Sequence, residues 1–307
     1  MHPAFSILFF TTLAGAAQGL VVLLALSHLL GLKLSPGFAS MALIVAWLLL
    51  VAGLASSFLH LGHKMRAWRA ALMWRTSWMS REVIILPAFI ALVALWWLAL
   101  RFGYKSNWLP VLLIVGSVVL WYCTAMIYAC LRFVEEWAHP LTVINFTLIG
   151  LSSGLVLGCA LAAWRQDLAL VQAATPAALA MTIAAWISRT LSLRRNAALR
   201  HKSTLQSATG IQAKNLTQKS MGMSAGAFNT REFFHGAKQV TLRNVKWGFV
   251  VLTFALPALM LVWALASQTT LPLLLALLIQ APGLIAERWF FFAQAKHPQN
   301  LYYQVVS

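Results

Sequence analysis

The sequence contains 307 residues, of which 61 % are hydrophobic and only 9 % are charged. Charged residues normally approach a quarter of a soluble domain, so this composition excludes a soluble protein and indicates an integral membrane protein. The net charge of +17 does not indicate a nucleic acid partner, because the basic residues lie in loops that border apolar stretches. There, anionic lipid headgroups and partner subunits offer the opposite charge.

Eight apolar stretches each come close to the roughly 20 residues that a helix needs to cross about 30 Å of hydrocarbon. They lie at about residues 7–30, 40–61, 83–100, 109–131, 141–163, 170–187, 247–266 and 270–286. The apolar runs are continuous, without the alternating ten-residue pattern of a β-barrel. The sequence therefore predicts an all-α polytopic membrane protein with about eight transmembrane helices, in which residues 1–307 form one membrane domain.

Basic residues are unevenly distributed between the two sides of these eight spans. One side carries 19 of the 23 Lys and Arg residues and the other carries 4. The rich side consists of the residues before 7, 62–82, 132–140, 188–246 and those after 287. Because short cytoplasmic loops retain Lys and Arg, we expect this side, and with it both termini, to be cytoplasmic.

The loop at residues 62–82 alternates cations with tryptophans. Both side chains are favoured at the level of the lipid headgroups, so we expect the segment to lie along the cytoplasmic interface. Either it is a membrane-surface helix and nothing more, or it is a docking surface for a partner subunit. The candidate docking residues are Arg69, Trp74, Arg75, Trp78 and Arg81.

A second cytoplasmic segment, residues 194–246, is a basic insert between the sixth and seventh spans. It carries ten basic residues and one acid, Glu232. It is too polar to span the membrane and too poor in large apolar residues to form its own core. Either it is disordered on the lipid surface or it orders against a cytoplasmic partner. The second alternative is preferred, with anchors at Phe228, Phe233, Phe234 and His235.

The chain offers little for catalysis on its own. Cys123, Cys130 and Cys159 fall inside predicted spans, lack CxxC spacing and lack a fourth thiol to complete an iron–sulfur or zinc set. A nucleophile elbow, a phosphate-binding glycine loop and a metal triad are absent from the sequence. We therefore expect no metal site in this chain and assign the redox centres to partner subunits.

Two ionisable residues at the membrane edge are the strongest functional candidates. His60 ends the second span, and Glu82 begins the third after an Arg-rich loop that can return it near His60. An imidazole that titrates near neutrality can exchange a proton with a quinone and hydrogen-bond its oxygen, and a carboxylate can accept a second proton. The alternative is that both residues merely cap the ends of helices.

The last span is followed at once by Glu287 and Arg288. Adjacent opposite charges at the edge of a membrane form weak pairs. We interpret them as a boundary pair without a functional role.

Haem b requires separate consideration, because buried b-type haem usually takes imidazole ligands from neighbouring helices. His60, His63 and His139 lie at the same cytoplasmic level and leave a bis-histidine site open. All three lie at or beyond helix ends, and no span carries a histidine deep inside. Haem is therefore the less favoured alternative.

Nearly the whole chain resembles the membrane-anchor subunits of the dimethyl sulfoxide reductase family. The resemblance rests on the eight spans, the opening Met1-His2-Pro3-Ala4-Phe5-Ser6, and the motifs His60-Leu61-Gly62, Met65-Arg66-Ala67 and Ser80-Arg81-Glu82. It implies an anchor that holds a four-cluster iron–sulfur subunit and, through it, a molybdopterin catalytic subunit. Electrons would pass between that arm and quinone, either menaquinone or ubiquinone, in the anchor.

Residue by residue, His60 matches the family's histidine associated with quinol binding. Arg66 matches the arginine that follows that histidine, and Glu82 matches the acid that closes the loop. His63-Lys64 departs from the small residue and proline common at this point of the family, and the insert at 194–246 is a second departure.

The predicted orientation separates two branches of that family. With the loop at 62–82 inside, the chain is similar to anchors of cytoplasm-facing sulfite dehydrogenases, in a bacterial inner membrane, where sulfite oxidation delivers electrons to quinone. A quinol-oxidising anchor of a dimethyl sulfoxide or N-oxide reductase is the alternative. A structural tether without quinone chemistry, and a transporter whose helix breaks lie at Pro257, Pro272 and Pro282, are the interpretations from other classes.

Overall fold

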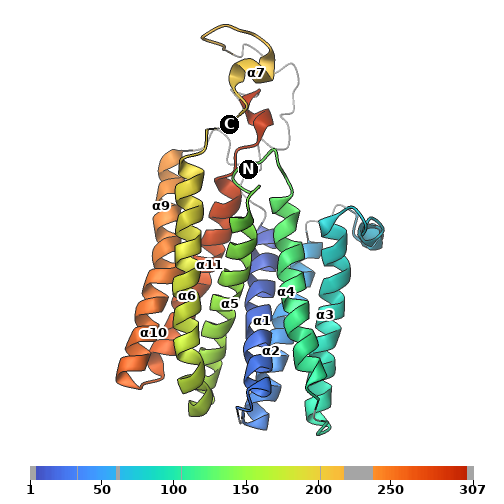
Figure 1. The fold of residues 1–307 in the computed structure, drawn as a ribbon, viewed down its shortest axis with the longest axis vertical. Coiled ribbons are helices and arrows are strands. Elements are labelled where there is room, and N and C mark those ends of the chain that lie inside the picture. Colours follow the sequence, from blue (N-terminus) through green and yellow to red (C-terminus); the bar gives the residue numbers. More distant parts are fainter. Residues whose placement is uncertain are drawn as a thin grey trace.

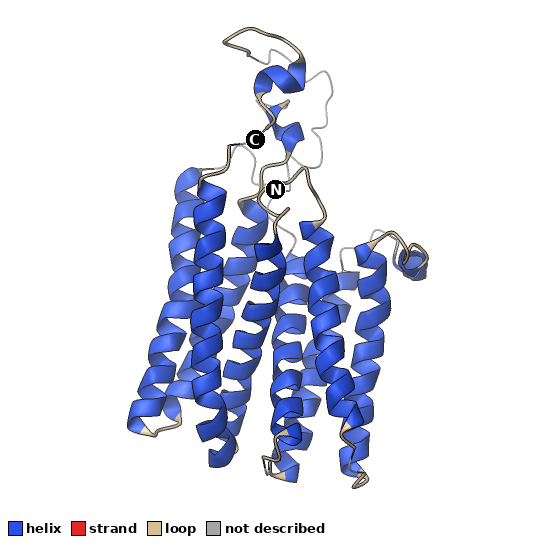
Figure 2. Cartoon of the chain, in the orientation of Figure 1, coloured by secondary structure: helices blue, strands red, loops and turns tan. Residues whose placement is uncertain are grey.

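The computed structural model describes residues 5–32, 34–59, 63–104, 106–200, 202–217 and 238–302. Within these ranges the chain is helical and contains no strand (Figure 2). The helices are α1 (Phe5–Leu29), α2 (Pro36–Phe58), η1 (Lys64–Ala71), α3 (Trp78–Arg101), α4 (Trp108–Ala129), α5 (Pro140–Trp164), α6 (Leu168–Ala197), α7 (Leu205–Thr209), α9 (Gln239–Val250), η2 (Val251–Ala255), α10 (Leu256–Ser267), α11 (Leu271–Ala293) and η3 (Pro298–Leu301).

Eight helices in the described part of the chain are long and apolar enough to cross a membrane, with α9, η2 and α10 joined into one of them, Gln239–Ser267. They run side by side as an elongated bundle (Figure 1). The all-α class and the eight predicted spans are therefore confirmed. The basic end is the end of the bundle where α1 begins and α11 finishes, and the segments after α2, α4 and α6 lie there too. That this end is cytoplasmic stays a prediction.

The central contact of the bundle joins α1 to α5 without intervening side chains. A Cβ added to Gly19 would lie 2.2 Å from the carbonyl oxygen of Gly150, and one added to Gly154 would lie 2.2 Å from the carbonyl carbon of Gly19. Four-residue spacing of small residues lets two membrane helices approach this closely. Gly15, Gly19, Gly150 and Gly154 have that spacing, and they fix α1 and α5 as the axis of the fold.

The remaining helices lie on the two sides of that axis. α3 and α4 pack together at one edge, and α6, α9, α10 and α11 form the other side (Figure 1). Short polar caps begin several spans: Ser35 for α2, Ser77 for α3, His139 for α5 and Asp167 for α6 each accept a backbone hydrogen bond.

Helices α6 and α11 extend beyond their predicted limits, because charged residues inside them ended the apolar stretches in the sequence. α6 continues from the predicted 187 to Ala197, and α11 from 286 to Ala293. The correction is largest for Glu287 and Arg288, which are 1 % and 4 % exposed. They are not a boundary pair but part of the core of the bundle.

Candidate functional site

Glu82 lies in the second turn of α3, at the basic end, and is 6 % exposed. The hydroxyl of Thr124 on α4 donates a hydrogen bond to its Oε1. Cys123 and Tyr128, also on α4, lie within electrostatic range of the carboxyl group. A buried carboxyl group is costly in a membrane protein unless it is hydrogen-bonded, so Thr124 is the residue that makes this position tenable.

The turn before Glu82 is held by its neighbour Arg81. The Arg81 guanidinium donates to the carbonyl oxygens of Trp74 and Arg75, both at 2.9 Å. It also lies 4.1 Å above the Trp78 ring, and this ring meets Tyr122 edge-on at 5.3 Å. These contacts fasten the loop to the start of α3 and to α4, so Glu82 follows a rigid turn.

The other residues predicted for the quinone site, Arg66 and His60, are not shown in contact with Glu82. Arg66 is exposed on η1, which lies beside α3 and away from the other helices (Figure 1). His60, Leu61 and Gly62 lie outside the described residues. The structure therefore locates Glu82 and Arg66, and the juxtaposition of Glu82 with His60 stays a prediction.

Among the predicted docking residues, Arg69, Trp74 and Arg75 are exposed at the basic end. Trp78 is half-buried against Tyr122, and Arg81 is used within the chain as described above. The segment thus divides into an exposed part, available to lipid or to a partner, and a part that stabilises the turn. The anchors predicted at Phe228, Phe233, Phe234 and His235 lie outside the described residues.

Of the three histidines considered for haem, His139 has a defined structural role. It precedes α5, and its Nδ1 accepts a hydrogen bond from the backbone N–H of Leu141 at 3.1 Å. Partial burial, together with the positive charge of Arg195, lowers the pKa of His139 below its ordinary value. His63 is exposed before η1. No group of three or more potential metal ligands occurs within the described ranges.

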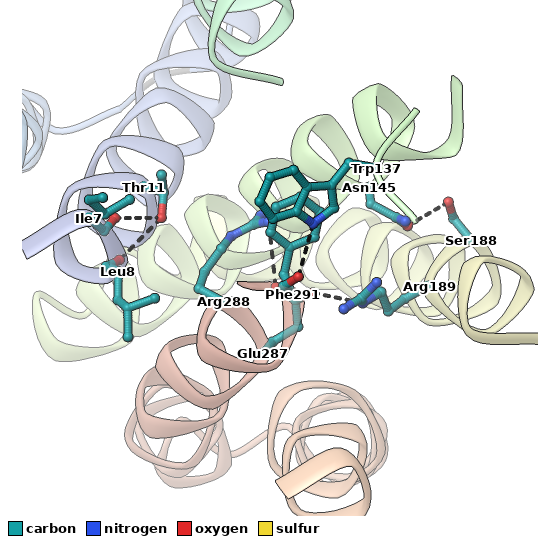
Figure 3. A network of polar contacts seen from close by, with 10 residues as sticks. All are labelled: Ile7, Leu8, Thr11, Trp137, Asn145, Ser188, Arg189, Glu287, Arg288 and Phe291. Carbon is teal, nitrogen blue, oxygen red and sulfur yellow. Dashed lines mark hydrogen bonds and ion pairs between the residues drawn. The ribbon is translucent and has the colours of Figure 1, made fainter. Parts of the chain in front are cut away.

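Sequence reasoning missed a charged cluster on the other side of the bundle (Figure 3). Arg189 Nε on α6 lies 2.7 Å from Glu287 Oε1 on α11, and Arg288 Nη1 lies 3.5 Å from Glu287 Oε2. The first contact is a charge pair rather than a well-aligned hydrogen bond. The Arg288 guanidinium also lies 3.9 Å above the Phe146 ring.

Charges buried within a membrane protein are expensive and commonly mark functional positions. A sequence signal for this cluster does exist: polar residues recur every seven positions within three spans. A hydropathy pattern does not reveal it, because it averages over such isolated residues. The geometry thus defines a multi-pass helical membrane protein with three buried acidic residues, among those described, near one end, of which Glu82 and Glu287 lie within membrane-spanning helices and Glu136 lies in the segment after α4.

Comparison with known proteins identifies its class. The chain belongs to the DMSO reductase anchor subunit (DmsC) family, whose model matches residues 1–294. It is therefore a membrane anchor subunit of an oxidoreductase, which implies catalytic and iron–sulfur partner subunits. It is 44 % identical to a sulfite dehydrogenase subunit of Allochromatium vinosum over 327 aligned positions that cover 100 % of both chains. It is also 29 % identical to anaerobic dimethyl sulfoxide reductase chain YnfH of Escherichia coli over 120 residues, 38 % of this chain and 42 % of the other.

Proposed function

We propose that this anchor is the quinone-reactive subunit of a complex that oxidises sulfite on the cytoplasmic side and passes the electrons to the quinone pool. The observation that carries the proposal is the buried carboxyl group of Glu82, hydrogen-bonded to Thr124 at the basic end of the bundle. The full-length similarity to a subunit of a sulfite dehydrogenase supports the choice of electron donor.

The chemistry at the site is proton transfer that accompanies electron transfer. Reduction of a quinone takes two electrons from the partner arm and two protons, and it yields a hydroquinone. Glu82 gives a proton to one quinone oxygen, and the Thr124 hydroxyl holds the carboxyl group in position for the transfer. His60 is proposed for the second oxygen, on the sequence pattern alone, and Arg66 for the edge of the site. The proposed quinone is menaquinone or ubiquinone.

Partner subunits supply the remaining redox groups. The iron–sulfur clusters and molybdopterin are proposed to reside in a four-cluster subunit and a catalytic subunit. Arg69, Trp74 and Arg75 are the proposed contact residues, because their side chains are exposed beside the turn that leads to Glu82. Docking there would place the partner arm, which supplies the electrons, beside the proposed quinone site.

The opposite direction of electron flow is the second candidate function. In that case the anchor oxidises quinol for a sulfoxide or N-oxide reductase, and the observation in its favour is the partial match to YnfH. Electron donors distinguish the two. A purified complex that reduces a quinone analogue with sulfite supports the first function, and one that oxidises a quinol analogue with dimethyl sulfoxide but ignores sulfite supports the second.

The site itself is tested on the complete complex with Glu82→Gln and His60→Ala. Both variants are expected to lose quinone turnover while the partner arm keeps its activity with an artificial electron acceptor. Glu135→Gln is the matched control, because Glu135 lies at the same end of the bundle but outside the site. Unchanged quinone turnover in Glu82→Gln rejects the role proposed for Glu82.

A further inference from the structure

Polar residues recur at seven-residue intervals on three neighbouring helices. The repeats are Asn145, Ser152 and Cys159 on α5; Thr175, Thr182, Arg189 and Asn196 on α6; and Gln280, Glu287 and Gln294 on α11. Seven residues are about two turns, so each set lies along one face of its helix with steps of about 10.5 Å. We refer to these residues together as the polar seam.

The three faces meet each other inside the bundle, at successive levels. Nearest the basic end, Arg189 pairs with Glu287, and Ser188 donates to Asn145 at 2.8 Å (Figure 3). At the deepest level, Thr175 on α6 approaches the Cys159 sulfur on α5 at 3.9 Å.

The middle level contains a directed chain of hydrogen bonds. The Gln280 amide donates to Ser152 at 3.3 Å, and Ser152 and Thr182 are 2.8 Å apart. Thr182 donates its own hydrogen to the Ala178 carbonyl, so Ser152 is the donor in the pair with Thr182. Three helices thus share one hydrogen-bonded chain in the interior of the membrane domain.

A π-helical turn in a fourth helix, Gln239–Ser267, contacts this middle level. Pro257 has no N–H to donate to the carbonyl of Thr253, four residues earlier, and residues Val251–Ala255 form a π-helical turn. The amide of Gln280 donates to the freed Thr253 oxygen at 3.2 Å. Gly283 permits this approach, since a Cβ there would lie 2.7 Å from Thr253 N. π-helical turns within α-helices occur frequently at functional sites.

The seam retains buried polar atoms that have no hydrogen-bond partner among the described residues. They are Arg189 Nη2, Asn196 Nδ2, Gln280 Oε1 and Gln294 Nε2, and Thr253 Oγ1, next to the seam at Gln280, has none either. Buried polar groups of native proteins are nearly always hydrogen-bonded, to protein or to water. Buried polar atoms without a protein partner at successive levels of the seam therefore indicate positions for water molecules.

The seam also reaches the surface at the basic end. Asn196 and Gln294, the next members of the repeats after Arg189 and Glu287, line an open pocket of about 720 Å³. Leu193 and Phe290, one turn from the charged pair, line it as well. The polar track therefore starts at a pocket and continues inward past Glu287 to Gln280.

We propose that the polar seam is a water-accessible proton path that opens at this pocket, with Glu287 as the group that exchanges protons. The Glu287 carboxylate takes a proton from a hydronium ion on the pocket side, and water is left behind. The carboxyl group then gives the proton to a water molecule deeper in the seam and becomes a carboxylate again beside Arg189. This path lies on α5, α6 and α11, whereas Glu82 lies on α3, so the inference does not depend on the quinone site.

Water access is tested by cysteine substitution in the full complex in membrane vesicles, after Cys123 and Cys130 are replaced by alanine and Cys159 by serine, which keeps a polar atom in the seam. Thr182→Cys is placed in the seam, and Ile183→Cys is the matched control at the same depth on an exposed, lipid-facing side of α6. A small charged methanethiosulfonate reagent is added on the side of the basic end. It is expected to label Cys at position 182 at least about tenfold faster than Cys at position 183, because the charged reagent must leave water to reach position 183. Filling the pocket with Asn196→Trp is expected to slow the labelling at 182. Equal rates at the two positions overturn the proposal.

Proton exchange by Glu287 is tested with dicyclohexylcarbodiimide, which modifies protonated carboxyl groups in apolar surroundings. Peptide mapping by mass spectrometry is expected to find Glu287 modified, and the peptide unmodified in Glu287→Gln. A Glu287 that stays unmodified, in protein whose Thr182→Cys variant is labelled, overturns its role in proton exchange. Neither measurement involves quinone turnover, so failure here is distinct from failure of the quinone proposal.

Discussion

Thr124 on α4 donates its hydroxyl hydrogen to the buried Glu82 carboxyl group on α3, which links the two helices at one edge of the bundle. Thr124→Val keeps the shape of the side chain and removes the donor. Loss of one partner of a buried hydrogen bond costs about 1–3 kcal/mol, so we expect quinone turnover to fall by about tenfold or more. The measurement is the kcat of quinone reduction by the complete complex.

Two controls belong to this prediction. Thr124→Ser retains a donor and is expected to keep most of the turnover. Thr147→Val removes a half-buried hydroxyl on α5 whose hydrogen bond within the described part of the chain goes to Val143 of the same helix, and it is expected to leave kcat unchanged. If Thr124→Val turned over like the unsubstituted protein, the hydroxyl would have no positioning role.

The pair formed by Arg189 and Glu287 predicts a large loss of stability when one charge is removed. Arg189→Met leaves Glu287 with Arg288 as its remaining charge partner, at the longer distance of 3.5 Å. Breaking a buried ion pair from one side costs about 3–5 kcal/mol, so we expect a clear decrease in the Tm of the purified complex. Arg195→Met is the control, because among the described residues Arg195 forms hydrogen bonds to the Glu135 carbonyl and the Asn196 side chain and no buried ion pair.

The glycine contact between α1 and α5 predicts a sharp difference between two Gly→Ala substitutions. Gly19→Ala would drive a methyl group into the Gly150 carbonyl, and overpacking of this kind costs about 1–3 kcal/mol or more. Gly248→Ala meets nothing within 4 Å. Quantification of intact complex in the membrane is expected to find less protein for Gly19→Ala and normal amounts for Gly248→Ala. Equal amounts would contradict the close approach of the two backbones.

The cap at His139 predicts that stability depends on pH. Its folded-state pKa lies below the ordinary value of 6.5, because burial and Arg195 disfavour the charged imidazole. Above pH 6.5 the His139 imidazole is neutral in both the folded and the unfolded state, and the cap is intact. As the pH falls through 6.5 toward the lower folded pKa, the unfolded state binds a proton first, so stability decreases.

Thermal unfolding between pH 8 and pH 5, about the range in which histidine titrates, measures this effect. His139→Asn keeps a good N-cap without titration in this range, so the decrease in Tm is expected to be smaller in that variant. Burial also lowers the pKa of His297, which therefore contributes with the same sign, and some decrease remains. A variant whose Tm followed the same pH curve as the unsubstituted protein would contradict the assignment to His139.

The sequence was sufficient for the helical class and the eight spans, because membrane-spanning length and continuous apolar character are local properties. It also identified Glu82 as a candidate, since an acid at the start of an apolar span is visible without a fold. The partner of Glu82 was not predictable in this way. Thr124 is an ordinary polar residue 42 positions away, and only the packing of α3 against α4 brings them together.

The charged pair on the other side was missed for a different physical reason. Arg189 and Glu287 each stand where a hydropathy pattern ends, so the pattern places them at the edges of spans. Each helix in fact continues by about two turns or more beyond the predicted limit, and the opposite charge on the neighbouring helix makes burial tolerable. The repeat of polar residues every seven positions is the pattern that indicates such a contact.

Direct contact between the backbones of α1 and α5 has a mechanical consequence. Glu82 and Glu287 lie in helices on opposite sides of that contact, and neither side can slide along the other without separating the glycine faces. Relative motion of the two sides therefore requires a displacement of whole helices rather than rotation of side chains at the dividing line.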